Sequence, residues 1–351
     1  AASKNDIKIG CLRSQLVSNP ELIEPHLARY ARYEDHSFTA LNTAFIRDGA
    51  FIYLPEGKVL DEPIHLLFIS KAGDHPIISQ PRILIVAGKG SKADVIERYV
   101  TPPPILPPQG GKEKGGGSSF THAVTEIILG EGASLNHYKL VQEAKDAFHI
   151  GTTQVWENRE SRFNSFSVTL AGKLVRNNLN VSLNGEGAKC VLNGLYLVSE
   201  DRHVDNTTLI DHPQIRGTSR QLYKGIVGGK GTAVFSGKIL VREDAQKTDA
   251  QQINKNLLLS EEATVDTKPQ LEIRADDVKC THGAAVGYLD EDAIFYLKTR
   301  GLAGQEAARL LACGFANEII QAIGLESIRT ELNQLLLDQL SGPSYQGGFR
   351  R

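Results

Sequence analysis

The sequence predicts a mainly β protein whose strand-rich middle lies between helical segments at both ends. Short apolar runs, separated by Gly, Pro and Asp, begin near residue 50 and continue to about residue 287. Several of these runs alternate apolar and polar residues with a period of two, as in a strand with one buried face. Apolar residues return to helical spacing after Asp290.

The N-terminal segment is expected to be helical over residues 12–33. Leu12, Leu16 and further apolar residues recur there at roughly helical spacing. Pro20 interrupts the pattern, so we expect a break between two short helices. We therefore assign residues 1–36 to an N-terminal helical region.

The strands begin with the runs "AFIYLPEG", "IHLLFIS" and "RILIVAGKG". The segment "TPPPILPPQGGKEKGGGSS" at 101–119 follows, and it is rich in Pro and Gly with almost nothing to bury. We expect a flexible surface loop there. The loop lacks the G-x-x-x-x-G-K-[ST] spacing of a phosphate-binding loop.

The middle of the chain repeats a glycine turn followed by a strand-like run. The turns lie at 88–91, 130–133, 185–188 and 229–232. Many strands with short turns are compatible with a sandwich, a barrel or a β-helix. The turn-plus-strand repeat favours a stacked β-helix, because hairpin dipeptides such as Asn-Gly occur at few of the junctions. We assign residues 37–287 to this β core.

The C-terminal segment is expected to be helical again. Ala307, Leu311, Phe315 and Ile319 are four residues apart and share one stripe. Leucines and isoleucines beyond residue 324 continue the pattern in a further helix. We assign 288–351 to a C-terminal helical region.

Composition excludes several classes of function. The 351 residues are 41% hydrophobic and 23% charged, with a net charge of -2, so no broad basic field attracts nucleic acid. No apolar run approaches the roughly 18 residues of a membrane span. Four scattered cysteines do not form a disulfide framework and favour a reducing compartment.

Enzyme motifs are missing from the sequence. It contains no G-x-S-x-G, H-E-x-x-H or C-x-x-C, and no dinucleotide fingerprint between a strand and a helix. Asp244, Asp249 and Asp266 could line a groove, as in carbohydrate-active parallel β-helix enzymes. That carboxylate groove is the alternative function, although acidic residues in turns are usually only solvated.

The stretch "DDVKCTHGAAVG" carries two potential metal ligands, Cys280 and His282. Apolar parity changes at Asp276 and Asp277, so we expect a turn there and a strand in which Cys280 and His282 share one face. Zinc or an iron–sulfur cluster needs about four ligand positions. The pair is therefore either half of a metal site or a buried cysteine beside a hydrogen-bonded histidine.

Residues 211–323 resemble the SufB/SufD family of iron–sulfur cluster assembly proteins. The resemblance rests on "SRQLYKGIVGGKGTAVFSGKILV", "KTDAQQINKNLLLSEEATVDTKPQLEIRADDVKCTHGAAVG" and "DEDAIFYLKTRGLAGQEAARLLACGFANEII". The pattern "VDTKPQLEI" followed by "DVKC-x-HGA" is similar to the SufD branch in particular. Upstream of residue 211 the match is looser.

The resemblance implies a right-handed parallel β-helix flanked by the two helical regions. It implies a non-catalytic scaffold subunit that assembles with a SufB-type subunit and a SufC-type ABC ATPase in the bacterial cytoplasm or the plastid stroma. Such a complex is linked to iron acquisition and to cluster formation at the interface with SufB.

The resemblance also implies sites. Cys280 and His282 would bind iron or a nascent cluster shared with the SufB-type subunit, and no cofactor would be bound stably by the chain alone. The residues expected to dock the ATPase are Phe295, Leu297, Leu302, Leu311 and Phe315. An open β-helix end also allows a homodimer of the isolated chain.

Overall fold

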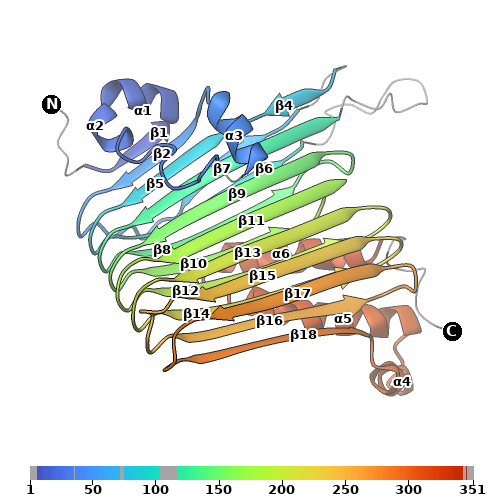
Figure 1. Cartoon of the computed structure of the whole chain (residues 1–351). Helices are drawn as coiled ribbons and strands as arrows, with labels where there is room; N and C mark the ends of the chain where they lie inside the picture. Colours follow the sequence, from blue (N-terminus) through green and yellow to red (C-terminus); the bar gives the residue numbers. More distant parts are fainter. Residues whose placement is uncertain (1–5, 35, 72–74, 103–117, 343–344, 346–351) are drawn as a thin grey trace.

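The computed structural model describes residues 6–34, 36–71, 75–102, 118–342 and 345. The chain winds into a parallel β-solenoid of about 8 turns, and its strands form two sheets (Figure 1). Helices lie in the N-terminal and C-terminal parts of the chain. The predicted fold class, a mainly β parallel β-helix between helical regions, is confirmed. The segment 103–117, which covers most of the expected Pro/Gly loop, lies outside the described residues.

The first sheet, sheet A, runs from the N-terminal to the C-terminal end of the solenoid. In spatial order its strands are β1 (Lys8–Cys11), β2 (Gly49–Leu54), β5 (Arg82–Ala87), β7 (Ser119–Leu129), β9 (Phe148–Glu157), β11 (Leu174–Leu183), β13 (His203–His212), β15 (Thr232–Val241) and β17 (Thr264–Ile273), with β4 (Ile77–Ser79) beside β7. Apart from the antiparallel β1–β2 pair, the neighbours are parallel.

The second sheet, sheet B, faces sheet A across the core. From the C-terminal end its strands are β18 (Lys279–Tyr288), β16 (Asp249–Leu258), β14 (Thr218–Val227), β12 (Lys189–Val198), β10 (Arg162–Thr169), β8 (Ser134–Gln142), β6 (Lys92–Val100) and β3 (Ile64–Ile69). The chain alternates between the sheets from one strand to the next over most of the solenoid, so each neighbour within a sheet is one coil away.

The predicted glycine turns make the corners of the coils. Gly132 has a φ of 65°, in the left-handed region that glycine adopts without a steric penalty. At Gly130 a Cβ would lie 2.7 Å from the backbone nitrogen of Lys89, in the corner of the preceding coil. Successive corners therefore stack too closely for a side chain at this position.

The interior of the solenoid is mostly apolar but contains a buried charged cluster. Glu97 contacts His137 at 3.0 Å, and Glu143 contacts His149 at 2.8 Å. Burial by itself would raise the pKa of Glu97, but the His137 hydrogen bond and the nearby Lys139 charge lower it to about 2. The carboxylates of this cluster are therefore stabilised in their charged form.

The N-terminal region is less helical than expected. Helices α1 (Leu12–Ser18) and α2 (Pro20–Ile23) meet at the predicted break, but the segment that follows forms turns. Buried Glu126 explains this, because its carboxylate accepts hydrogen bonds from the backbone nitrogens of Ala28, Tyr30 and Ala31 at 2.9–3.0 Å. Helix α3 (Ser37–Ala44) then packs on β7 at the start of the assigned β core.

The C-terminal region consists of α4 (Glu291–Thr299), α5 (Gly304–Gln321) and α6 (Glu326–Leu340). Helices α5 and α6 cover the outer face of sheet B, where their Ala, Ile and Leu residues join one buried cluster with β8, β10 and β12. Arg98 on β6 pairs with Glu331 on α6 at 2.6 Å, and Lys224 on β14 pairs with Glu318 on α5 at 2.5 Å. No helix within the described ranges is long and apolar enough to cross a membrane.

Candidate functional site

The C-terminal end of the solenoid is open. Among the described strands, β17 pairs only with β15 and β18 only with β16, so each has one edge of 10 residues without a partner strand there. The interior between the two sheets ends at these strands. A residue that faces inward on β17 or β18 is therefore only partly covered.

Cys280 and His282 both lie on β18 and face this open interior. Their Cα partners on β16 are Ala250 and Gln252, which are buried at 1% and 0% exposure. Cys280 is half-buried and packs against the inner core, whereas His282 is exposed. The expected shared face is thus present, and it is accessible because β18 is the last strand of its sheet.

The turn expected at the two aspartates is also present. Asp276 and Asp277 form a bend between the end of β17 and the start of β18. Asp277 pairs with Lys247, and the backbone nitrogen of Lys247 donates to the carbonyl oxygen of Asp277 at 2.6 Å. This corner holds β18 in register with β16.

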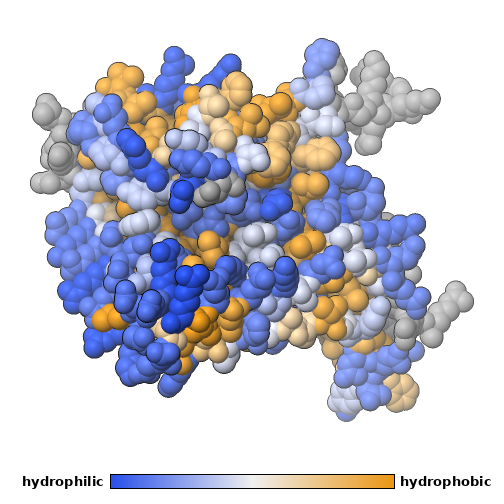
Figure 2. Space-filling model, viewed as in Figure 1, coloured by the Kyte–Doolittle hydropathy of each residue, from blue (hydrophilic) through white to orange (hydrophobic). Residues whose placement is uncertain are grey.

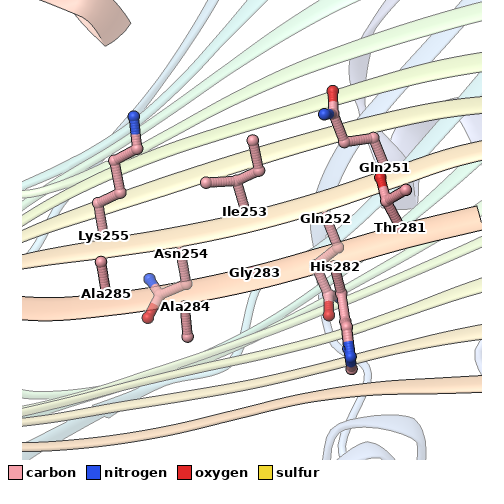
Figure 3. A pocket seen from close by; sticks show the side chains of 10 residues that line it. All are labelled: Gln251, Gln252, Ile253, Asn254, Lys255, Thr281, His282, Gly283, Ala284 and Ala285. Atoms are coloured by element: carbon pink, nitrogen blue, oxygen red, sulfur yellow. The ribbon is translucent and has the colours of Figure 1, made fainter.

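A hollow of about 450 Å³ lies along the edge formed by β16 and β18 (Figure 3). Its lining residues are Gln251, Gln252, Ile253, Asn254, Lys255, Thr281, His282, Gly283, Ala284 and Ala285. Gln252, Asn254, His282 and Ala284 point to one side of the sheet, and Gln251, Ile253 and Lys255 point to the other. His282 therefore stands among amide side chains at the mouth of the interior.

The thiol of Cys280 is held mainly in its protonated form. Burial raises the pKa of Cys280; a hydrogen bond with the backbone of Ala250 lowers it, and the charge of Asp249 raises it. Because a thiolate is the form that binds metal, iron would have to displace this proton.

The donor set at the open end is incomplete. Among the residues that the structure describes, no group of three or more His, Cys, Asp or Glu side chains could hold a metal ion. A thiolate and an imidazole are suitable ligands for iron, but they fill only two positions. Cys280 and His282 alone therefore supply about half of the ligands that such a site needs.

The carboxylates of the alternative function lie on three different elements. Asp249 is on β16 and pairs with Arg220 at 2.7 Å, Asp266 is on β17, and Asp244 lies in the turn between β15 and β16. No observation favours a carboxylate groove built from these three residues.

The residues expected to dock the ATPase fall into two groups. Phe295 on α4 is 68% exposed, whereas Leu297, Leu302 and Leu311 are half-buried. Phe315 lies against sheet B, where the Nζ atom of Lys224 is 4.4 Å from its ring centroid. Phe295 is thus the most accessible of the five.

Two exposed residues of the same region were not expected. Tyr296 on α4 is 57% exposed and Leu310 on α5 is 53% exposed. An apolar stripe marks the buried face of a helix, so large side chains that point away from that face do not belong to the pattern. Adjacent large aromatic residues, as at Phe295 and Tyr296, were the available signal.

Comparison with known families matches nearly the whole chain. Residues 68–315 match the family described as "SUF system FeS cluster assembly, SufBD core domain", and residues 2–66 match the "SufBD protein N-terminal region".

Individual relatives agree with the family match. An iron–sulfur cluster assembly SufBD family protein of Synechocystis is 38% identical over 85% of this chain and 65% of its own length. The chloroplastic protein ABCI7 of Arabidopsis thaliana is 35% identical over 84% and 61%. The iron–sulfur cluster assembly protein SufD of Escherichia coli is 34% identical over 87% and 70%. The chain therefore spans less than two thirds of the length of the first two.

Proposed function

The chain belongs to the SufBD family of iron–sulfur cluster assembly proteins, and we propose that it acts there as a SufD-type scaffold subunit without catalysis of its own. The observation that carries this proposal is the position of Cys280 and His282. They face an open interior between two strands with free edges.

The partner at the open end is a SufB-type subunit. Strands β17 and β18 offer unpaired backbone groups that another strand can pair with. Among the described residues, apart from chain neighbours, nothing lies within 4 Å of the position that a Cβ would occupy at Gly283 or Gly287, so this face of β18 is open to a partner. Val286 and Ile273 add exposed apolar surface at the same end. The same features support a homodimer when the chain is alone.

The shared site receives iron or a nascent cluster as cargo. Cys280 and His282 supply two ligands from this chain, and the SufB-type subunit supplies the others. The half-buried thiol releases its proton when iron binds, and the imidazole binds through an unprotonated ring nitrogen.

The C-terminal helices receive a SufC-type ABC ATPase. Phe295 and Tyr296 on α4 form an adjacent pair of exposed aromatic side chains, which are enriched in protein interfaces. The salt bridges of α5 and α6 to sheet B would transmit a movement of the ATPase to the β-helix. The complex would work in the cytoplasm or the plastid stroma, since its relatives include Escherichia coli SufD and chloroplastic ABCI7.

The test is anaerobic cluster reconstitution on the complex with SufB-type and SufC-type subunits. Cys280→Ala and His282→Ala should each reduce cluster formation at least about tenfold, while the complex still assembles. Cys313→Ala is the matched control, because this half-buried cysteine lies on α5. Unchanged cluster formation in both site variants would refute the iron role of the pair.

A further inference from the structure

A ladder of amide side chains leads from the solenoid interior to His282. Gln221 on β14, Gln252 on β16 and His282 on β18 are successive Cα partners in sheet B. Partners on neighbouring strands are about 4.8 Å apart. The three side chains therefore occupy consecutive rungs, and His282 is the outermost.

The hydrogen bonds along this ladder run in one direction. Gln252 Nε2 donates to Gln221 Oε1 at 2.8 Å, and Gln221 Nε2 donates to Thr208 Oγ1 at 2.8 Å. Gly237 on the facing sheet makes room for the donor end, because a Cβ there would lie 2.3 Å from Gln252 Nε2. The amide group of Gln252 is thus held from the inner side.

The other end of this amide has no partner. Gln252 is fully buried, and its Oε1 atom accepts no hydrogen bond from any of the described residues. A buried acceptor without a donor destabilises the folded protein, so an atom of this kind calls for an explanation. The next rung on that side is His282, which lines the same hollow and points to the same side of the sheet (Figure 3).

We propose that Gln252 is a positioning residue for His282: its Oε1 accepts a hydrogen bond from one ring N–H and leaves the other ring nitrogen unprotonated to bind iron. Metal-binding histidines commonly donate their second ring N–H to such an acceptor, which selects the tautomer and orients the ring. The inference rests on the proposed function for the iron, but the hydrogen bond itself does not depend on it.

The hydrogen bond can be tested on the isolated protein by nuclear magnetic resonance of ¹⁵N-histidine. A hydrogen-bonded ring N–H exchanges slowly with water and gives a correlation signal, which His282→Ala assigns by removing it. Gln252→Leu removes the acceptor and should remove the same signal. Gln252→Glu keeps an acceptor and should retain it, although both changes remove the bond to Gln221.

The matched control is Gln251→Leu, because Gln251 is the neighbouring residue on the opposite face of β16. It should leave the signal in place. If no ring N–H signal is lost in His282→Ala, or if the signal survives in Gln252→Leu, the inference is wrong. Equal loss in the Leu and Glu variants would also overturn it, since that pattern indicates a structural effect only.

Ferrous iron binding to the anaerobic complex supplies the second measurement. Gln252→Leu should weaken it about 10- to 100-fold, with Gln252→Glu and Gln251→Leu near the unaltered protein. An unchanged affinity in Gln252→Leu, where His282→Ala does weaken binding, contradicts the positioning role. If His282→Ala does not weaken iron binding while the N–H signal behaves as expected, the proposed function fails and the hydrogen bond stands.

Discussion

The two ends of the solenoid are built from similar strands but are finished differently. At the N-terminal end, antiparallel β1 covers the edge of sheet A, and the turn segment after α2 is tied to the buried Arg82–Glu126 pair. At the C-terminal end, β17 and β18 leave two free edges of 10 residues each. Long free edges can pair with another strand, which is why we propose the C-terminal end as the interface with another subunit.

The hydropathy of the surface also differs along the solenoid. Figure 2 shows hydrophobic residues gathered over the N-terminal elements, whereas the face formed by the middle strands of sheet A is mostly hydrophilic. Phe38 and Leu41 of α3 are exposed, and so is Phe45, the residue directly after this helix. The N-terminal end is therefore held by a buried ion pair and its backbone contacts, whereas the C-terminal end presents the edges of two 10-residue strands.

The largest effect is expected from Glu126→Ala, which breaks the N-terminal closure. The change leaves the Arg82 guanidinium buried without its carboxylate, and it removes the acceptor for three backbone nitrogens. The free energy of unfolding, measured by chemical denaturation, should fall by about 3–5 kcal/mol. Glu131→Ala is the control, because its ion pair with Lys89 is exposed and worth under about 1 kcal/mol. A similar loss in both variants would contradict the special role of Glu126.

Acid should loosen the N-terminal end through His122. Burial, with the nearby charges of His149 and Arg82, lowers the pKa of His122 to about 4, and its ring contacts Phe38 of α3. Between pH 6.5 and 4, His122 binds a proton in the unfolded chain but stays mostly neutral in the folded chain, so the free energy of unfolding falls as the pH falls. At pH 4 this difference in pKa lowers the free energy of unfolding by an amount on the order of 2–3 kcal/mol.

Unfolding measured across this pH range checks the sign. His122→Asn should flatten the dependence, and hydrogen exchange in α3 and β7 should increase at low pH in the unaltered protein. An identical pH dependence in the variant would show that His122 is not the group responsible. His212, whose pKa is also lowered to about 4 by burial, should account for part of the remaining slope.

Val286→Lys tests whether the open C-terminal end is the interface with the SufB-type subunit. Val286 faces the open interior on β18 and is 44% exposed, so a charge there opposes burial against a partner. Association with the SufB-type subunit should weaken at least about tenfold, roughly 1.4 kcal/mol, in titration calorimetry. Val59→Lys is the same change at an exposed position near the N-terminal end and should leave association unaltered. Equal weakening would show that the open edge is not the interface.

The smallest effect is expected at the corner before β18. Asp277→Asn removes an exposed ion pair with Lys247 but keeps the turn hydrogen bond. The free energy of unfolding should change by less than about 1 kcal/mol. A larger loss in denaturation would mean that charge, more than backbone pairing, holds β18 in place.

Local patterns predicted much of this molecule. Glycine positions such as Gly132 marked the corners, because only glycine adopts the required backbone without strain. The four-residue spacing from Ala307 to Ile319 predicted α5, whose buried residues include both. The helical prediction for 12–33 was wrong beyond Ile23, because the carboxylate that binds the backbone of this segment belongs to Glu126, far away in the sequence.

The sequence by itself determined that Cys280 and His282 share a face, because a strand alternates its side chains with a period of two. It could not determine that this face is open, since exposure depends on which strand ends the sheet. Only the tertiary structure placed β18 last, set Gln252 beside His282 and left its buried oxygen without a partner among the described residues. Strand order is decided by pairing between distant segments, and a single sequence does not record that pairing.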